Sequence, residues 1–176
     1  DIPVCTHLKL GADLLVRLGS EGVLTGVKDS SGDDVGFRRL VMKNQEAGEP
    51  LSLLTGHEVV VDGAYLAGAH GSVPGLGNVD PAGYVRMDRA ARAGDWAAVR
   101  EEQDRLARLF EIVFVPADRV GPTAGIGAFK TALRHLGVIE TNVMSPPMAV
   151  LDELQARRIA EICDAVGLTR APVASA

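Results

Sequence analysis

The sequence predicts an α/β protein whose 176 residues divide into two kinds of region. From residue 1 to about residue 94, short apolar runs alternate with segments of helical periodicity, a pattern typical of βα units and a parallel sheet. From residue 95 onward, apolar residues recur at the helical spacing i, i+3, i+4 and i+7. We therefore predict a βα region over residues 1–94 and a helical region over residues 95–176.

Four short strands, each followed by a helix, are expected in the first region. The strands are predicted over residues 2–3, 23–27, 51–54 and 72–76. The helices are predicted over residues 10–18, 34–47, 58–67 and 81–93. Asp33 or Asp34 is the expected N-cap of the second helix, and Pro81 suits the first turn of the fourth. Because a helix between two strands lets both run in the same direction, the sheet should be parallel.

Three helices are expected in the second region. The first carries an apolar stripe that includes Trp96, Val99 and Leu106. The other two are predicted over residues 121–136 and 147–166. No strand pattern interrupts them, so this region should be wholly helical.

Composition and charge exclude several classes of function. The net charge is −5 and the basic residues are scattered, so no nucleic-acid partner is expected. No apolar run is long enough to cross a bilayer and no signal peptide is visible, so no membrane partner is expected either. Cys5 and Cys163 follow no metal-ligand spacing, and two free thiols are typical of a reducing cytoplasm. We expect a cytoplasmic protein.

Two kinds of binding site are disfavoured by residue spacing. A metal-dependent aldolase needs clustered ligands, but the four histidines are dispersed and only Glu58 stands beside one of them. The glycine-rich segment 71–77 lacks the Gly-Lys-Ser/Thr of a phosphate-binding loop, and Pro74 removes a backbone donor from it. We expect no metal in the site.

Lys28 is the candidate catalytic residue. It ends an apolar run, 23–27, and precedes a polar, turn-prone stretch, 29–34. Burial beside apolar side chains disfavours an ammonium ion, and the neutral amine is a nucleophile that forms Schiff bases with ketones and aldehydes. The alternative interpretation is that Lys28 only begins a solvated loop.

Several segments, taken in order, resemble the dihydrodipicolinate synthase / N-acetylneuraminate lyase family. Residues 22–33 (GVLTGVKDSSGD) resemble the strand that bears its lysine. Residues 1–6 (DIPVCT) are similar to the end of its Tyr-Asn-x-Pro motif, and residues 55–58 (TGHE) to its Ser-Gly-Asp-Asp turn. The remaining matches are 68–73 with Asn78 and Pro81, which resemble Gly-Ala-Asp-Gly…Asn-x-x-Pro, and 129–133 with Gly137 and Pro146-Pro147, which resemble its C-terminal helices.

The resemblance implies the second half of a (β/α)8 TIM barrel, followed by a C-terminal helical extension. A complete barrel takes about 250 residues. The family's tyrosine and its Gly-x-Thr-Thr/Ser-Thr motif would lie upstream of Asp1. We therefore expect the N-terminal half of the barrel to come from the same polypeptide or from a companion chain, and the native particle to be a homo-oligomer.

The resemblance also implies a lyase or aldolase that needs no cofactor. Lys28 would form an imine with pyruvate or another 2-oxo acid, and the resulting enamine would add to an aldehyde or be released by retro-aldol cleavage. In a parallel barrel the working residues lie where strands end, and several candidates fall at such points. The candidate substrate-binding residues are Thr6, Ser30, Gly56, His57, Glu58 and Val73, the last through its backbone carbonyl.

Three positions depart from the family's best-known branches. Cys5 stands where the synthase branch has an arginine that binds the carboxylate of the aldehyde, and a thiol cannot replace a bidentate guanidinium. Gly75 stands where the sialic-acid branch has a serine, and His57 where an acidic residue or tyrosine is usual. Sugar-acid aldolases, hydroxy-oxo-acid aldolases and dehydratases remain. The alternative is a non-catalytic half barrel that only self-associates.

Overall fold

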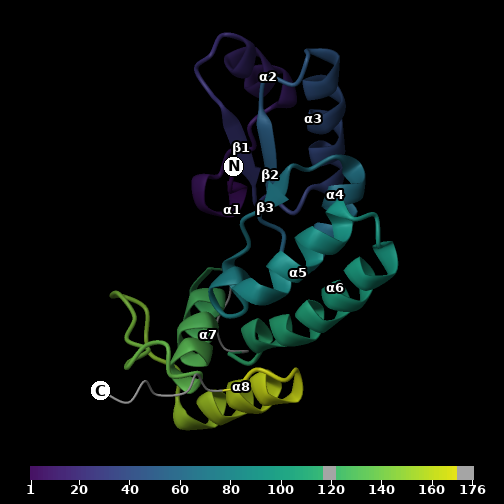
Figure 1. Cartoon of the computed structure of the whole chain (residues 1–176). Helices are drawn as coiled ribbons and strands as arrows, with labels where there is room; N and C mark the ends of the chain where they lie inside the picture. The colour runs from purple at the N-terminus through teal and green to yellow at the C-terminus, as the bar shows by residue number, and fades with distance from the viewer. Residues whose placement is uncertain (117–121, 170–176) are drawn as a thin grey trace, which may run out of the picture. The chain divides into compact units, whose positions relative to one another are not determined.

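The computed structural model describes residues 1–116 and 122–169 (Figure 1). The described chain forms two compact units. The first contains residues 1–74 and 84–103, and the second contains residues 75–83 together with those from 104 onward. Two of the long helices contribute residues to both units. The predicted boundary near residue 94 therefore stays a prediction.

The first unit is built on a parallel sheet, as predicted. Strand β1 (Gly26–Asp29) pairs with β2 (Ser52–Thr55), and β2 pairs with β3 (Gly71–Ser72), all in parallel. The register sets Lys28 beside Leu54 and Thr55 beside Ser72. The carboxyl ends of the strands therefore lie at one edge of the sheet.

Helices separate the strands. Helix α2 (Ala12–Ser20) precedes β1, α3 (Asp34–Glu46) joins β1 to β2, and α4 (Val61–Ala67) joins β2 to β3. The side chain of Asp33 caps α3 by accepting a hydrogen bond from the Gly36 backbone N–H at 2.8 Å, which confirms one of the two predicted caps. Helix α4 begins three residues later than predicted.

The predicted strand at Ile2-Pro3 is wrong. This segment forms a single helical turn, α1 (Pro3–Thr6), with proline at its start. Proline has no backbone donor for a strand ladder and suits the first turn of a helix. Asp1 alone pairs with β1: its backbone nitrogen donates to the Lys28 carbonyl at 2.7 Å, and the Ser30 N–H donates to the Asp1 carbonyl at 2.9 Å.

Strand β1 lies further along the chain than predicted. The backbone N–H groups of Val23 and Leu24 donate to the Leu18 carbonyl, at 2.9 and 3.2 Å. These apolar residues therefore close the end of α2 instead of starting the strand. As a consequence, Lys28 lies inside β1 and Asp29 ends it.

The other two strand predictions need smaller corrections. Strand β2 is displaced by one residue from the prediction of 51–54. Strand β3 (Gly71–Ser72) contains only two residues, and a 3-10 helix, η1 (Gly75–Asn78), begins within the predicted span of 72–76. Pro74 cannot donate to a strand ladder, which is the reason that β3 ends early.

The core of the first unit lies between the sheet and its helices. It is formed by six buried side chains, with Val27 packed against them: Leu15, Phe37, Leu40, Val41, Leu51 and Leu53. Successive side chains of a strand point to opposite faces. Because Val27 and Leu53 face the core, Lys28 and Leu54 project from the opposite face of the sheet.

The described residues after β3 form helices and no further strand, as predicted for the region from residue 95 onward. Helix α5 (Pro81–Arg92) and helix α6 (Trp96–Phe110) lead into a 3-10 helix, η2 (Glu111–Phe114). Helix α7 (Pro122–His135) packs against η2 and against α8 (Glu153–Ala165). The predicted start of the second helix at Gly121 lies outside the described residues.

Helix α8 starts later than the predicted Pro147. Asp152 and Gln155 form a reciprocal capping box, in which the Asp152 side chain accepts from the Gln155 N–H at 2.8 Å.

In the part of the chain that the structure describes, no helix is long and apolar enough to span a membrane.

Candidate active site

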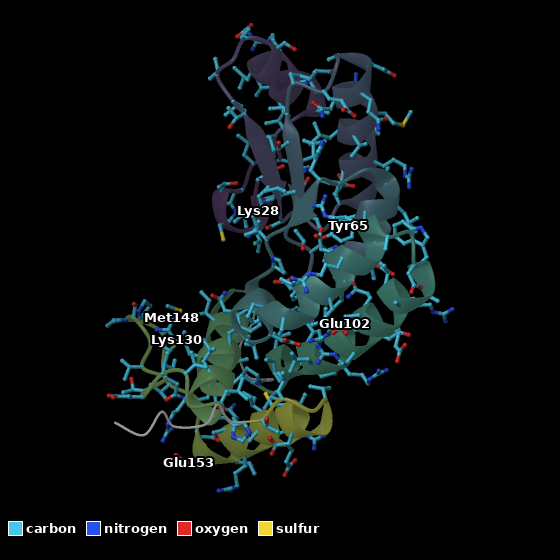
Figure 2. All side chains as sticks on the ribbon, viewed as in Figure 1. Lys28, Tyr65, Glu102, Lys130, Met148 and Glu153 are labelled. Atoms are coloured by element: carbon cyan, nitrogen blue, oxygen red, sulfur yellow. The ribbon has the colours of Figure 1, made fainter. Side chains whose placement is uncertain are left out.

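Lys28 is the third residue of β1 and is partly buried on the sheet face away from the helices. Figure 2 labels it on this strand. Among the described residues, its amine has no hydrogen-bond or ion-pair partner. The other three lysines all have one: Lys9 binds Asp1 and Asp29, Lys43 binds Asp13 at 2.5 Å, and Lys130 binds the Val143 carbonyl at 2.7 Å.

Gly56 brings the ends of β1 and β2 together. A Cβ atom placed on Gly56 would lie 2.5 Å from Lys28 Cε and would also overlap Ser30 Oγ. Its backbone N–H donates to the Asp29 carbonyl at 2.7 Å. Lys28, Ser30 and Gly56 are therefore in contact, and glycine is required because the two neighbouring side chains fill the space of any larger residue.

Val73 directly follows β3, so it lies at the same edge of the sheet as Lys28 and Gly56, where the strands end. Its backbone N–H donates to the Thr55 carbonyl at 2.8 Å, which extends the β2–β3 pairing by one bond. Its side chain is 48% exposed. The predicted role of its carbonyl in binding substrate stays a prediction.

His57 and Glu58 follow Gly56 in the same loop. The His57 N–H donates to Thr55 Oγ1 at 3.1 Å, and His57 Nδ1 lies 3.3 Å from Asp34 Oδ1. The Glu58 carbonyl accepts hydrogen bonds from Tyr84 at 3.1 Å and from Gln103 at 3.2 Å. The loop that begins at Gly56 is therefore fixed at several points.

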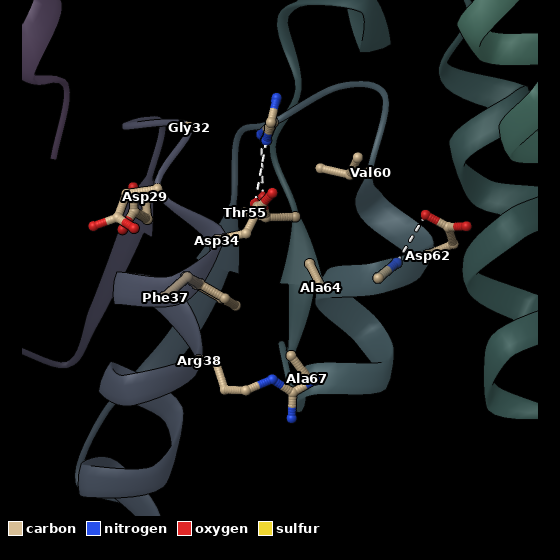
Figure 3. A pocket seen from close by; sticks show the side chains of 13 residues that line it. Asp29, Gly32, Asp34, Phe37, Arg38, Thr55, Val60, Asp62, Ala64 and Ala67 are labelled. Atoms are coloured by element: carbon tan, nitrogen blue, oxygen red, sulfur yellow. Dashed lines mark hydrogen bonds and ion pairs between the residues drawn. The ribbon is translucent and has the colours of Figure 1, made fainter.

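A cavity of about 250 Å³ lies beside this loop, between α3 and α4. Phe37 and Ala64 face each other across it (Figure 3), and Arg38 and Asp62 contribute polar walls. It reaches the sheet at Asp29 and Thr55, which belong to the face that packs against the helices. The cavity and Lys28 are thus on different faces of the sheet.

Thr6 is a predicted substrate-binding residue whose described hydrogen bonds are all local. It is exposed at the end of α1, and its hydroxyl lies 3.2 Å from the Ile2 carbonyl and 3.1 Å from the Leu8 carbonyl. No described contact joins Thr6 to Lys28. Its role in substrate binding stays a prediction.

The sequence interpretation missed an ionic cluster behind Lys28. Lys9 Nζ lies 2.6 Å from a carboxylate oxygen of Asp1 and 2.6 Å from one of Asp29. Burial by itself would raise the pKa of Asp29, but hydrogen bonds from Lys9 and Ser31 and the charge of Lys9 bring it below its ordinary value. The sequence offered one signal: if Asp29 were in the strand, it had to face away from Lys28.

Parallel strands joined by helices, with a lysine near the carboxyl end of one strand that has no described partner, are typical of α/β-barrel proteins, whose working residues lie where the strands end. The chain belongs to the dihydrodipicolinate synthetase family, whose model matches residues 1–166. Its fold is the second half of a (β/α)8 barrel followed by a C-terminal helical extension.

Relatives of known name support this assignment. The chain is 32% identical over 167 residues to the 4-hydroxy-tetrahydrodipicolinate synthase of Phenylobacterium zucineum, which covers 94% of this chain and 53% of that protein. It is 28% identical over 156 residues to the synthase of Rhizobium meliloti, covering 88% of this chain and 50% of that protein. The chain therefore spans about half the length of the curated relatives it matches.

Solved structures share the fold. YagE, an E. coli prophage protein of the dihydrodipicolinic acid synthase family crystallised with pyruvate, has a TM-score of 0.84 at 21% identity, over 96% of this chain and 55% of that one. The dihydrodipicolinate synthase of Aquifex aeolicus has a TM-score of 0.81 at 24% identity, over 98% of this chain and 55% of that one.

Proposed function

We propose that this chain carries the Schiff-base lysine of a class I lyase or aldolase that acts on pyruvate or another 2-oxo acid together with an aldehyde. The observation that carries this proposal is the state of Lys28. Its amine alone among the four lysines lacks a described partner, and its side chain lies against Ser30 and Gly56 at the edge where the strands end. The family of the chain and the pyruvate bound to YagE support the same chemistry.

The proposed reaction begins when the Lys28 amine attacks the keto carbon. Loss of water leaves a protonated imine, which accepts an electron pair from the adjacent carbon when a proton or an aldehyde departs. The enamine that results then bonds to an aldehyde carbon, or it is protonated. Hydrolysis of the final imine releases the product and restores the amine.

The neighbouring residues have distinct proposed tasks. The Ser30 hydroxyl, which like the Lys28 side chain lies against Gly56, is proposed to bind the 2-oxo acid. Gly56 leaves room for the substrate beside the imine. Glu58 and the Val73 carbonyl are proposed to contact the rest of the substrate. The N-terminal half of a barrel would complete the site.

The residue at position 5 limits which kind of aldehyde the site can bind. Cys5 is an exposed, free thiol on α1, where the synthase branch has an arginine. A thiol makes no bidentate contact with a carboxylate. We therefore propose that the aldehyde is recognised through its own hydroxyl groups, as in a sugar-acid or hydroxy-oxo-acid aldolase. An aldehyde that is recognised through a carboxylate would need the arginine that this chain lacks.

Borohydride trapping with pyruvate tests the proposal. In the complete polypeptide that contains this chain, Lys28→Arg should abolish the reduced adduct and leave the fold intact, because arginine keeps the positive charge but forms no imine. Mass mapping of the trapped protein should place the adduct on Lys28.

Lys43→Arg and Lys130→Arg are the controls and should trap pyruvate like the unaltered protein. An adduct on another lysine would show that the mechanism is wrong. Absence of any adduct in the complete, folded polypeptide would favour the alternative of a non-catalytic half barrel.

A further inference from the structure

Residues 1–9 form a loop, with α1 inside it, whose two ends contact the strand that carries Lys28. At one end, the Asp1 backbone is hydrogen-bonded to Lys28 and Ser30 on either side of Asp29. At the other end, Lys9 reaches the Asp29 carboxylate at 2.6 Å. Helix α1, with Cys5 and Thr6, lies between these two anchors in the sequence.

One ammonium group joins the anchors. Lys9 Nζ is 2.6 Å from Asp1 Oδ2 and 2.6 Å from Asp29 Oδ2, and the two carboxylate side chains are only 1% and 5% exposed. Ser31 adds a backbone N–H to Asp29 Oδ1 at 2.7 Å. In the described contacts these two buried carboxylates therefore share a single side-chain cation, and its removal would leave both charges without a side-chain counter-ion.

We propose that Lys9 is a positioning residue, which holds the loop of residues 1–9 against the end of β1 and thereby fixes Lys28 and Ser30 in their places. This role rests on the function proposed above and adds to it a residue on the opposite face of the strand. In the described hydrogen bonds and ion pairs, Lys9 binds Asp1 and Asp29 and no predicted substrate-binding residue. It acts through Asp29, the immediate neighbour of Lys28.

The chain provides a matched control. Lys43 is as exposed as Lys9, at 37% against 35%, it also forms an ion pair with an aspartate, and both lysines line one cavity of about 260 Å³. Its partner, Asp13, is 86% exposed. An exposed pair of this kind contributes little, whereas loss of the cation between buried carboxylates is costly. The effects of Lys9→Met and Lys43→Met therefore differ chiefly because the partners of Lys9 are buried and the partner of Lys43 is exposed.

Hydrogen exchange tests the holding directly, without any chemistry at Lys28. The Ser30 N–H donates to the Asp1 carbonyl and is the reporter. Lys9→Met should speed its exchange at least about tenfold, because the anchor at Asp1 opens more often. Lys43→Met should leave it unchanged. Equal protection of Ser30 in the two variants would overturn the proposal.

The rate of borohydride trapping with pyruvate tests the consequence for Lys28 in the complete polypeptide. Lys9→Met should trap about tenfold more slowly or worse, and Lys9→Arg should keep most of the rate. The deficit should shrink at mildly acidic pH, because without Lys9 the burial of Asp29 favours its protonated form, and protonation removes one of the two buried charges. The double variant Lys9→Met with Asp29→Asn should recover much of the rate, since it removes one of the two buried negative charges that Lys9 neutralises.

A deficit in Lys9→Met that neither acid nor the double variant relieves would mean a general loss of structure and would also overturn the proposal. If the unaltered protein traps no pyruvate, the proposed function fails, while the exchange of Ser30 still decides whether Lys9 holds the loop. The two failures are therefore distinguishable.

Discussion

At the scale of single residues, the geometry around Lys28 depends on the absence of a side chain at Gly56. Gly56 lies where the ends of β1 and β2 approach, and its Cα faces Lys28 and Ser30. The main-chain angles of Gly56 do not require glycine, but the space does. A residue 28 positions from Lys28 in the sequence thus limits where the lysine side chain can lie.

Gly56→Ala should lower the rate of pyruvate trapping by roughly 100-fold, because the added methyl group displaces the Lys28 side chain by about an ångström. The fold should hold, since the Gly56 N–H bond to Asp29 does not involve the side chain. Circular dichroism and the trapping rate together check this expectation.

Gly63→Ala is the control, because a Cβ there meets nothing within 4 Å and Gly63 lies in α4, where alanine is the better helix former. It should trap like the unaltered protein. Wild-type trapping by Gly56→Ala would disprove the close contact.

At the scale of elements, one buried amide connects α3 to β2. Asn44 is 1% exposed; its Nδ2 donates to the Leu51 carbonyl at 2.9 Å and its Oδ1 accepts from the Leu51 N–H at 3.1 Å. Both backbone groups precede β2, so they have no ladder partner within the strand. The amide therefore takes the place of a backbone partner at the entry to the strand that ends at Gly56.

Asn44→Ala should reduce the free energy of unfolding by about 2–4 kcal/mol, because it leaves two buried backbone groups without partners. Urea denaturation measures the change. Asn78→Ala, which removes an exposed bond to the Gly75 carbonyl, should cost less than about 1 kcal/mol. If both variants unfolded at the same urea concentration, the buried hydrogen bonds of Asn44 would contribute no more to the free energy of unfolding than the exposed bond of Asn78.

At the scale of the whole molecule, the described sheet is open. Strand β3 is an edge strand, and the sheet face that carries Lys28 and Leu54 is not covered by the helices that pack against Val27 and Leu53. Open edges and apolar faces favour association with further strands. The chain also spans only about half of its relatives.

The native particle should therefore contain the remaining strands of the barrel, from the same polypeptide or from a companion chain, and it should be a homo-oligomer. Residues 1–176 expressed alone should associate or aggregate in sedimentation experiments and should show fast hydrogen exchange at β3. A stable, well-folded monomer of this segment would contradict the expectation.

The sequence by itself determined the elements whose signals are local. Periodicity and turn residues were sufficient for the helices after each strand, and Asp33 could be identified as a cap because capping involves residues only three apart. The parallel direction of the strands followed from the alternation of strand and helix. The ordered motifs around Lys28 were sufficient to identify the family.

The tertiary structure alone decided where β1 begins and what surrounds Lys28. The Leu18 carbonyl takes the N–H groups of Val23 and Leu24, so residues with strand propensity end a helix instead. The contact of Gly56 with Lys28 and the ion pair of Lys9 with Asp29 join residues 28 and 20 positions apart. Such contacts depend on how strands and loops are arranged in space, which composition and periodicity do not predict.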